Sequence, residues 1–132
     1  MAMKKKRSEL LTEVELEFMN ELWALGEGTV RDVLDNLPDA RNLAYTSGAT
    51  ILRILEQKAF VTSRKCGKRH VYTPTLAKGA YQSRSLRDLS MKLFDDAPAS
   101  LVARLVNDDE LTEEALGQIR ALVDRRLKND SG

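Results

Sequence analysis

Residues 44–74, AYTSGATILRILEQKAFVTSRKCGKRHVYTP, decide the fold of this chain. The stretch opens with small hydroxylated side chains where a helix would start, and its apolar stripe begins only after Thr50. A helix of this kind has a first turn suited to contact something other than its own core. Two β-prone runs follow, residues 60–64 and 70–73, on either side of a basic tip at residues 65–69. The stretch therefore predicts a helix followed by a basic β-hairpin.

Two further helices are predicted upstream of this stretch. Thr12 is placed as the N-cap of the first, with Glu15 closing a capping box, and the run GEG at residues 26–28 ends it. Thr29 would cap a second helix over residues 30–37, although Thr29 and Val30 are also candidates for a third short strand. Three helices and two strands joined by short links are typical of a winged helix-turn-helix domain, in which the sheet packs against the helices.

The composition of the 132 residues limits the classes of protein to consider. With 42% hydrophobic and 31% charged residues, the chain is typical of soluble globular proteins and has room for one domain, or one small domain with an appendage. The longest apolar runs are far shorter than the roughly 20 residues that span a bilayer, and no apolar signal segment follows the basic start. A single cysteine, Cys66, excludes an internal disulfide framework and a CxxC metal site. We therefore expect a cytoplasmic protein with no membrane insertion, no cofactor and no metal.

Charge is distributed unevenly along a chain whose net charge is only +1. Between Glu56 and Asp88 there is no acidic residue, and eight lysines and arginines lie there. This segregation supports a basic face that contacts phosphates, although a solvated charged surface would give the same pattern. The basic start at residues 1–9 has two interpretations, a phosphate-binding arm or a solubilising tail.

Helical periodicity divides the predicted helix that ends near Lys58 into two faces. One is a core face with a close approach at its glycine, and consists of Gly48, Ile51, Leu52 and Leu55. The other is short and polar, and consists of Thr46, Ala49, Thr50, Arg53 and Gln57. Short side chains let a helix approach base edges in the DNA major groove, where arginine can bind guanine with two hydrogen bonds. Taken singly, Thr46, Ser47 and Thr50 are explained better as a capped, exposed turn than as DNA contacts. Taken together, with a basic hairpin after them, they favour contact with DNA.

The DNA-contacting residues predicted in this way come from both halves of the stretch. They are Tyr45, Thr46, Ser47, Ala49, Thr50 and Arg53 in the helix, and Lys65, Lys68 and Arg69 at the hairpin tip. Tyr45 has two interpretations, contact with the DNA backbone or cover for the start of the helix. Gly67 supplies the turn. His70, the only histidine, is more typical of a packed or surface residue than of a ligand.

The C-terminal part of the chain is helical in pattern and carries several apolar stripes. The positions that we expect to be buried in a homodimer are Leu86, Leu89, Leu93, Leu101, Leu105, Leu116, Ile119 and Val123. About 50 residues form too small a volume to bury these stripes within one chain, so two arms would pack together. Folding of the arm back onto its own domain is the alternative. The predicted fold is mainly α with a small β wing, divided into a basic arm (1–9), a winged-helix DNA-binding domain (10–75), a helical dimerisation domain (76–128) and a tail (129–132).

Three segments of the sequence resemble the penicillinase-repressor family, the winged-helix repressors of β-lactamase and methicillin-resistance genes and their copper-responsive relatives. The segments are LTEVELEFMNELWALGEGTVRDVLDNL, AYTSGATILRILEQKAFV and GKRHVYTP. The family pattern is similar to W-[AS]-x-[TK]-T-V-x-T-x-L-x-R-L-x-x-K-G, followed by a wing of the form G-R-x-x-x-Y-x-P. The resemblance implies a homodimer that binds a palindromic operator on double-stranded DNA and represses transcription, in β-lactam-resistance or related genes. It assigns DNA-reading positions to Tyr45, Thr46, Ser47, Thr50 and Arg53, and wing positions to Lys68 and Arg69.

The chain departs from the family pattern at several positions. Leu43 stands where the family often has tryptophan, Gly48 where it usually has valine or isoleucine, and Ala59 where it has the turn glycine. In β-lactam-responsive members a membrane sensor metalloprotease cuts an Asn-Phe bond in the dimerisation helices, and the corresponding bond here joins Arg104 to Leu105. The copper-responsive relatives have a cysteine-rich tail, which this chain lacks.

Three other classes of function are set against DNA repression. A winged-helix module that binds proteins would favour large apolar anchors on the face with Thr46 and Arg53, and this face has none. An enzyme is disfavoured because one histidine, one cysteine and no glycine-rich phosphate loop form no recognisable catalytic group. A regulator that senses a small ligand, without any link to β-lactams, stays open.

Overall fold

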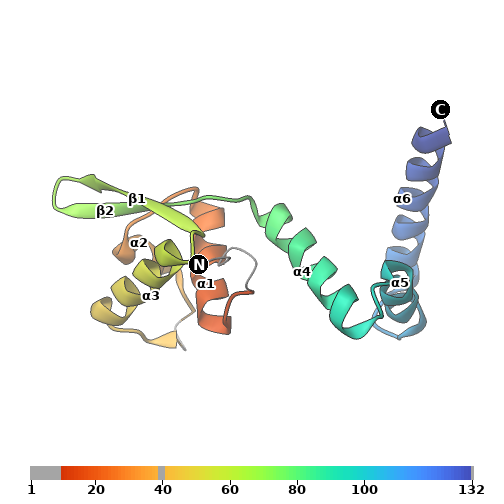
Figure 1. Cartoon of the computed structure of the whole chain (residues 1–132), viewed down its shortest axis with the longest axis horizontal. Helices are drawn as coiled ribbons and strands as arrows, with labels where there is room; N and C mark the ends of the chain where they lie inside the picture. Colours follow the sequence, from red (N-terminus) through yellow and green to blue (C-terminus); the bar gives the residue numbers. More distant parts are fainter. Residues whose placement is uncertain (1–9, 39–40, 132) are drawn as a thin grey trace, which may run out of the picture. The chain divides into compact units, whose positions relative to one another are not determined.

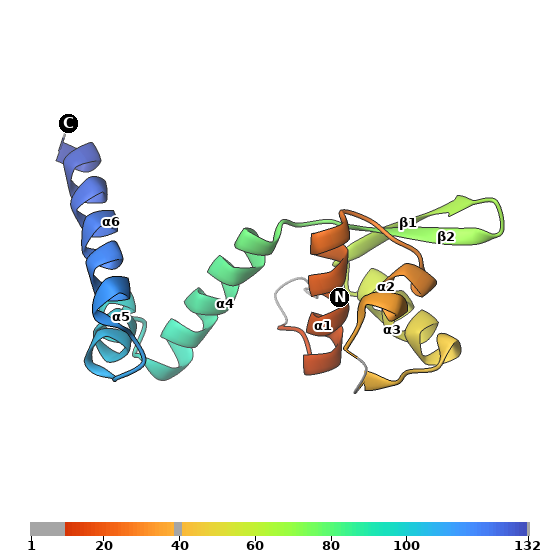
Figure 2. The same cartoon turned by 180° about the vertical axis from the view of Figure 1, so that it is seen from behind.

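The computed structural model describes residues 10–38 and 41–131, so the predicted basic arm at residues 1–9 lies outside the described residues. Three helices and a hairpin are followed by three more helices (Figures 1 and 2). In chain order they are α1 (Glu13–Leu25), α2 (Val30–Asn36), α3 (Tyr45–Gln57), β1 (Val61–Cys66), β2 (Arg69–Pro74), α4 (Lys78–Leu93), α5 (Pro98–Asn107) and α6 (Glu113–Ser131). This is the predicted fold class, a mainly helical winged-helix domain followed by C-terminal helices.

The chain divides into two compact units, Met1–Ser85 and Leu86–Gly132. The first contains the three helices and the hairpin, and α4 begins in the first unit and ends in the second. None of the helices within the described ranges is long and apolar enough to cross a membrane.

Two capping boxes start the first two helices. The Thr12 hydroxyl accepts a hydrogen bond from the Glu15 N–H at 3.2 Å, and the Glu15 carboxylate accepts one from the Thr12 N–H at 2.9 Å, as the sequence predicts. Thr29 and Asp32 make the same reciprocal pair at the start of α2. Because Thr29 begins this helix, the expected third strand at Thr29 and Val30 is wrong. The backbone of Gly28 instead forms an isolated bridge to Tyr72, with N–H to O distances of 3.0 and 2.8 Å.

The core of the first unit is built from the apolar stripes of its helices and from the base of the hairpin. Its largest fully buried side chains are Phe18, Phe60, Met19, Leu22, Leu52, Leu55, Val33 and Val61. Tyr81 from α4 closes this core, with its ring 5.9 Å from the rings of both Trp23 and Phe60. Its hydroxyl accepts a hydrogen bond of 2.8 Å from the Leu11 N–H. The first turns of α4 are therefore fixed to the winged-helix core.

One buried ion pair joins the start of α1 to the end of α3. The Lys58 ammonium donates to both carboxylate oxygens of Glu15, at 3.0 and 2.9 Å. Burial alone raises the pKa of this carboxyl, but the hydrogen bonds from Lys58 and from the Thr12 N–H outweigh that effect and hold the pKa below its ordinary value. Glu15 is therefore ionised at neutral pH and links two helices that the sequence separates by 43 residues.

The hairpin is longer than the sequence predicts. β1 and β2 pair antiparallel from Val61 opposite Pro74 to Cys66 opposite Arg69, which leaves only Gly67 and Lys68 in the turn. Of these two residues only Gly67 has a positive φ, +64°, the pattern of a two-residue type II′ turn. Such a turn continues the twist of the strands, so the basic residues expected in a loose tip are instead held on paired strands next to a tight turn.

Candidate nucleic-acid interface

Helix α3 has one buried face and one exposed face, as its periodicity predicts. Gly48, Leu52 and Leu55 are buried, whereas Thr46, Thr50 and Arg53 are exposed. A Cβ atom at residue 48 would lie 3.2 Å from methyl groups of both Val30 and Leu34, which confirms the predicted close approach and identifies α2 as the neighbour. The short, polar face of α3 is thus turned outward by the packing of its glycine face against α2.

The first turn of α3 has no side-chain cap. Its N-cap is Ala44, whose methyl side chain cannot accept a hydrogen bond. The helices α1 and α2, by contrast, both begin with a capping box. The hydroxyl of Thr50 donates to the carbonyl oxygen of Thr46 at 3.0 Å and so lies along the helix surface. Thr46 and Ser47 are exposed, but they do not serve as the caps that the alternative interpretation requires.

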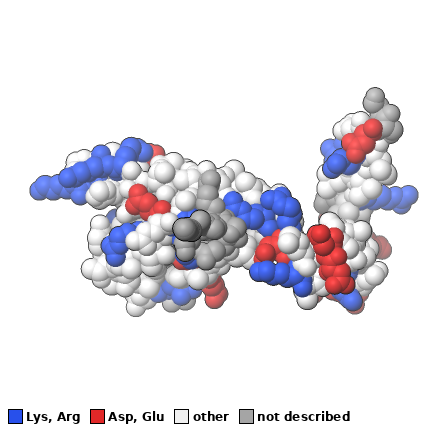
Figure 3. Space-filling view, viewed as in Figure 1, with Lys and Arg blue, Asp and Glu red and all other residues white. Residues whose placement is uncertain are grey.

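The basic side chains of the hairpin differ in their surroundings. Lys65, Lys68 and Arg69 are exposed near the turn, and Figure 3 shows the cations gathered along the hairpin. Arg64 differs because its guanidinium donates two hydrogen bonds to Glu27, at 2.9 and 3.0 Å. These bonds hold the pKa of the Glu27 carboxyl below its ordinary value. Arg64 thus ties the hairpin to the loop between α1 and α2.

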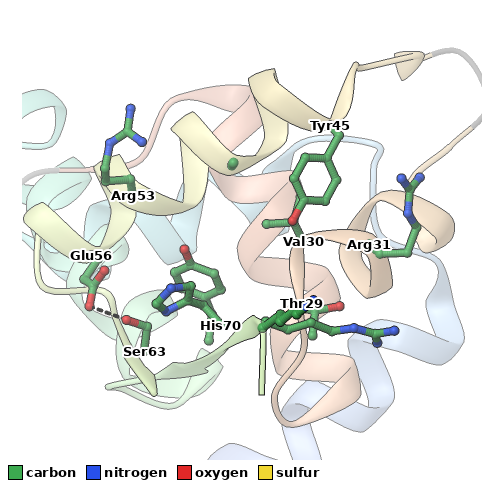
Figure 4. Close-up of a pocket in the computed structure, with 12 residues that line it drawn as sticks. Thr29, Val30, Arg31, Tyr45, Arg53, Glu56, Ser63 and His70 are labelled. Carbon is green, nitrogen blue, oxygen red and sulfur yellow. Dashed lines mark hydrogen bonds between the residues drawn. The ribbon is translucent and has the colours of Figure 1, made fainter. Parts of the chain in front are cut away.

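A groove of about 550 Å³ lies between α3, the start of α2 and the hairpin (Figure 4). Its lining residues are Thr29, Val30, Arg31, Tyr45, Ala49, Arg53, Glu56, Ser63, Lys68, Arg69, His70 and Tyr72. Four of them are cationic at neutral pH, Arg31, Arg53, Lys68 and Arg69. The one carboxylate, on Glu56, accepts a hydrogen bond of 2.7 Å from the hydroxyl of Ser63. The groove is therefore predominantly positive and suited to an anionic ligand.

The groove brings together about half of the residues predicted to contact DNA. Tyr45, Ala49, Arg53, Lys68 and Arg69 line it. The other four, Thr46, Ser47, Thr50 and Lys65, are exposed but lie outside its lining. The groove is only one part of the exposed surface of α3 and the hairpin, so its lining does not test contact with DNA. The role of all nine residues therefore stays a prediction.

Sequence reasoning missed several residues of the groove. Arg31 carries no sequence signal of such a position, because it precedes α3 by 14 residues and belongs to no basic run. The structure places its guanidinium carbon 5.5 Å from the centre of the Tyr45 ring. The sequence favours a packed or surface position for His70, and the pairing of β2 with β1 places this residue in the groove. Only the crossing of α2 over α3 and the register of the hairpin identify these two residues.

The positions predicted for dimerisation fall in α4, α5 and α6. Leu86, Leu89, Leu93, Leu105 and Val123 are among the exposed large apolar side chains of the chain. Leu116 and Ile119 are partly buried. Leu101 is already buried within one chain, at 9% exposure. The bond between Arg104 and Leu105 lies in the last turn of α5, where Leu105 is exposed.

Comparison with known proteins identifies a family, a related protein and a related structure. The model of the penicillinase repressor family matches residues 11–125. An uncharacterised 16.5 kDa protein from the ptsI 3′ region of Latilactobacillus sakei is 26% identical over 113 residues, which cover 86% of this chain and 77% of that protein. The solution structure of the DNA-binding domain of the repressor BlaI is 26% identical, with a TM-score of 0.49, and the similarity covers 58% of this chain and 90% of that one.

The family match extends over both units and most of their helices. It confirms the resemblance that the three sequence segments indicate. It also supports the expectation that the chain is not an enzyme, because penicillinase repressors are regulators. The chain belongs to the penicillinase repressor family.

Proposed function

We propose that this chain is a transcriptional repressor that binds a palindromic operator on double-stranded DNA as a homodimer in the cytoplasm. The observation that carries the proposal is the positive groove between α3 and the hairpin, lined by Arg53, Lys68 and Arg69. The name of the matching family points in the same direction.

In this proposal α3 enters the major groove of DNA and the hairpin follows the backbone. The small side chains of Ala49 and Thr50 let the helix axis approach the base edges. Arg53, exposed on the same face, can make two hydrogen bonds to a guanine, a contact worth roughly 1–3 kcal/mol of discrimination. Lys68 and Arg69 lie next to the hairpin turn and would bind phosphates, which supply affinity without sequence preference.

The exposed apolar side chains of the second unit support the proposed homodimer. Leu86, Leu93 and Leu122 are each more than half exposed, at 53%, 67% and 57%. A concentrated set of exposed apolar side chains is typical of an association surface. A two-fold dimer would present two α3 helices to half-sites about one helical turn apart, roughly 10 base pairs centre to centre.

The regulated genes and the inducing signal form the finer part of the proposal. By resemblance, the genes serve β-lactam resistance or a related function, and a membrane sensor metalloprotease cuts between Arg104 and Leu105. This bond lies within α5, so the protease must first open the last turn of that helix. Mass spectrometry of the chain from induced cells tests the assignment, because it requires a fragment that ends at Arg104.

A binding titration tests the proposed function. The operator is first selected from a random-sequence pool with the full chain, and its affinity is then compared with that of scrambled duplexes at several salt concentrations. We expect Arg53→Ala to weaken operator binding more than binding to scrambled DNA, because it removes a base contact. We expect Lys68→Ala to weaken both and to flatten the salt dependence, because it removes a phosphate contact.

Arg120→Ala is the matched control, since Arg120 is exposed on α6 and the substitution changes the net charge by the same amount. It should leave both affinities unchanged. The proposal fails if the pool yields no preferred sequence, or if the operator binds no better than scrambled DNA. Equal losses for Arg53→Ala and Lys68→Ala on both duplexes would contradict the division of roles.

A further inference from the structure

The five arginines between the start of α2 and the end of β2 fall into two groups according to their partners. Arg41 is paired with Glu17, and Arg64 with Glu27. Arg31, Arg53 and Arg69 all line the groove, and none of the ion pairs among the described residues includes them. A guanidinium without a carboxylate partner keeps its fork of N–H donors available for an anion. Arg31 belongs to this available group although it does not belong to α3 or the hairpin.

The side chain of Arg31 is held in place by an aromatic ring. Its guanidinium carbon lies 5.5 Å from the centre of the Tyr45 ring, within the range of a cation–π contact. Tyr45 is itself 51% exposed, so the pair forms part of the surface of the groove. Figure 4 shows the two side chains together, from α2 and α3, away from Arg53, Glu56 and Ser63 in that view. The contact restricts a long, flexible side chain and so reduces the entropy lost when it binds a ligand.

The position of Arg31 favours a phosphate over a base as its partner. The exposed face of α3 that is suited to base edges carries Ala49, Thr50 and Arg53, whereas Arg31 comes from the preceding helix. A guanidinium stacked on a ring still presents its N–H edges, which match the oxygens of a phosphate with two parallel hydrogen bonds. Contacts of this type position a protein on DNA without reading the sequence.

We propose that Arg31, positioned by the Tyr45 ring, binds a phosphate of the DNA backbone in the groove between α3 and the hairpin. The proposal rests on the proposed function and adds a backbone contact from α2 to those of the hairpin. It also gives Tyr45 a defined role, as the platform that orients Arg31. The DNA would then be held by cations from two separate elements, one before α3 in the chain and one after it.

Salt-dependent titrations of the full chain test this contact, with the selected operator and its scrambled duplex as probes. Arg31→Ala should lower the affinity for both duplexes by the same factor. The slope of log affinity against log salt should become shallower by about 0.9 per subunit, roughly 1.8 for a bound dimer, because each subunit loses one phosphate contact on duplex DNA. Arg31→Lys keeps the charge and should restore most of the slope. Thermal melting should give the same midpoint for all variants, because Arg31 is exposed.

Arg41→Ala is the control, since it removes one positive charge from the same unit but from a residue paired with Glu17 outside the groove lining. It should leave the slope unchanged. Wild-type slope and affinities in Arg31→Ala would overturn the proposal, and a loss on the operator alone would show a base contact instead. Failure of the wild-type chain to prefer the operator would refute the proposed repressor function, whereas the phosphate contact would still be measured on scrambled DNA.

Discussion

At the scale of single residues, Gly48 determines how closely α2 and α3 pack. The sequence predicts a close approach there because a glycine interrupts an otherwise apolar face. In the structure, a Cβ atom at this position would lie 3.2 Å from Cγ1 of Val30 and 3.2 Å from Cδ2 of Leu34. Since Val30 is buried and Leu34 only partly so, the leucine has more freedom to move aside. The glycine therefore brings the two helices together at the cost of some helix propensity.

Substitution of Gly48 separates these two effects. Alanine should recover about 0.8–1.0 kcal/mol of helix propensity and lose a similar amount in tight contacts, so that stability stays within about 1 kcal/mol of wild type. Gly48→Leu should destabilise by roughly 1–3 kcal/mol, because its additional atoms would have to enter the packed contact with α2. Urea unfolding measures both. Gly79→Ala, where a Cβ meets nothing within 4 Å, controls for propensity alone. Equal stabilities of the alanine and leucine variants would show that the helices are not in close contact.

At the scale of elements, the hairpin is oriented by acidic residues from two other segments. Glu27, from the loop before α2, accepts hydrogen bonds from Arg64 and, at 3.4 Å, from the hydroxyl of Thr73. Glu56, on α3, accepts one from Ser63. Together they connect both strands of the hairpin to the helices. Because the pKa of the Glu27 carboxyl is lowered, its connection is present at neutral pH and is lost only when the pH falls through that lowered pKa.

Replacement of Glu27 by glutamine distinguishes an effect of charge from an effect on the orientation of the hairpin, because the two change the affinity for DNA in opposite directions. If charge alone mattered, removal of an acid from a DNA-binding unit would tighten binding to all DNA. We expect the opposite for the operator, because loss of the paired hydrogen bonds to Arg64 frees the hairpin that carries Lys68 and Arg69. Binding to scrambled DNA should weaken as well, because Lys68 and Arg69 would contact phosphates without sequence preference. Glu13→Gln, at an exposed position of α1, is the control for charge, and tighter operator binding by Glu27→Gln would refute the role in orientation.

The elements differ in how well the sequence predicts them. The helices and the two faces of α3 are confirmed, because a 3.6-residue period in apolar side chains records burial directly. No pattern of side chains indicates the bridge between Gly28 and Tyr72, since it is made by backbone groups far apart in the chain. For the same reason Arg31 could not be placed in the groove, because its position depends on the crossing of α2 and α3. Sequence periodicity gives the faces of an element, whereas contacts between elements require the structure.

At the scale of the whole molecule, the exposed leucines of the second unit determine the expected assembly. Leu93, at 67% exposure, is the most exposed large apolar side chain among the described residues. Leu101, by contrast, is buried in the single chain and contributes to its own unit. Two linked DNA-binding units would bind an operator far more tightly than one, because the second contact becomes intramolecular.

Disruption of this surface should therefore reduce operator binding without any change in the groove. We expect Leu93→Glu to convert a dimer into a monomer in analytical ultracentrifugation, and to weaken operator binding strongly while binding to a single half-site is retained. Leu10→Glu, at 42% exposure in the first unit, should leave the dimer intact. A wild-type chain that sediments as a monomer at micromolar concentration, or a Leu93→Glu chain that remains dimeric, would contradict the assigned surface.

The hairpin also provides a natural attachment point for a spectroscopic reporter. Cys66 is the only cysteine in the sequence, is exposed, and lies on β1 directly before the turn. A maleimide dye would therefore label each chain once, at the tip of the wing, without any mutagenesis. Energy transfer between two such dyes on an assembled pair of chains would follow the separation of the wings in real time, both free and during capture of DNA.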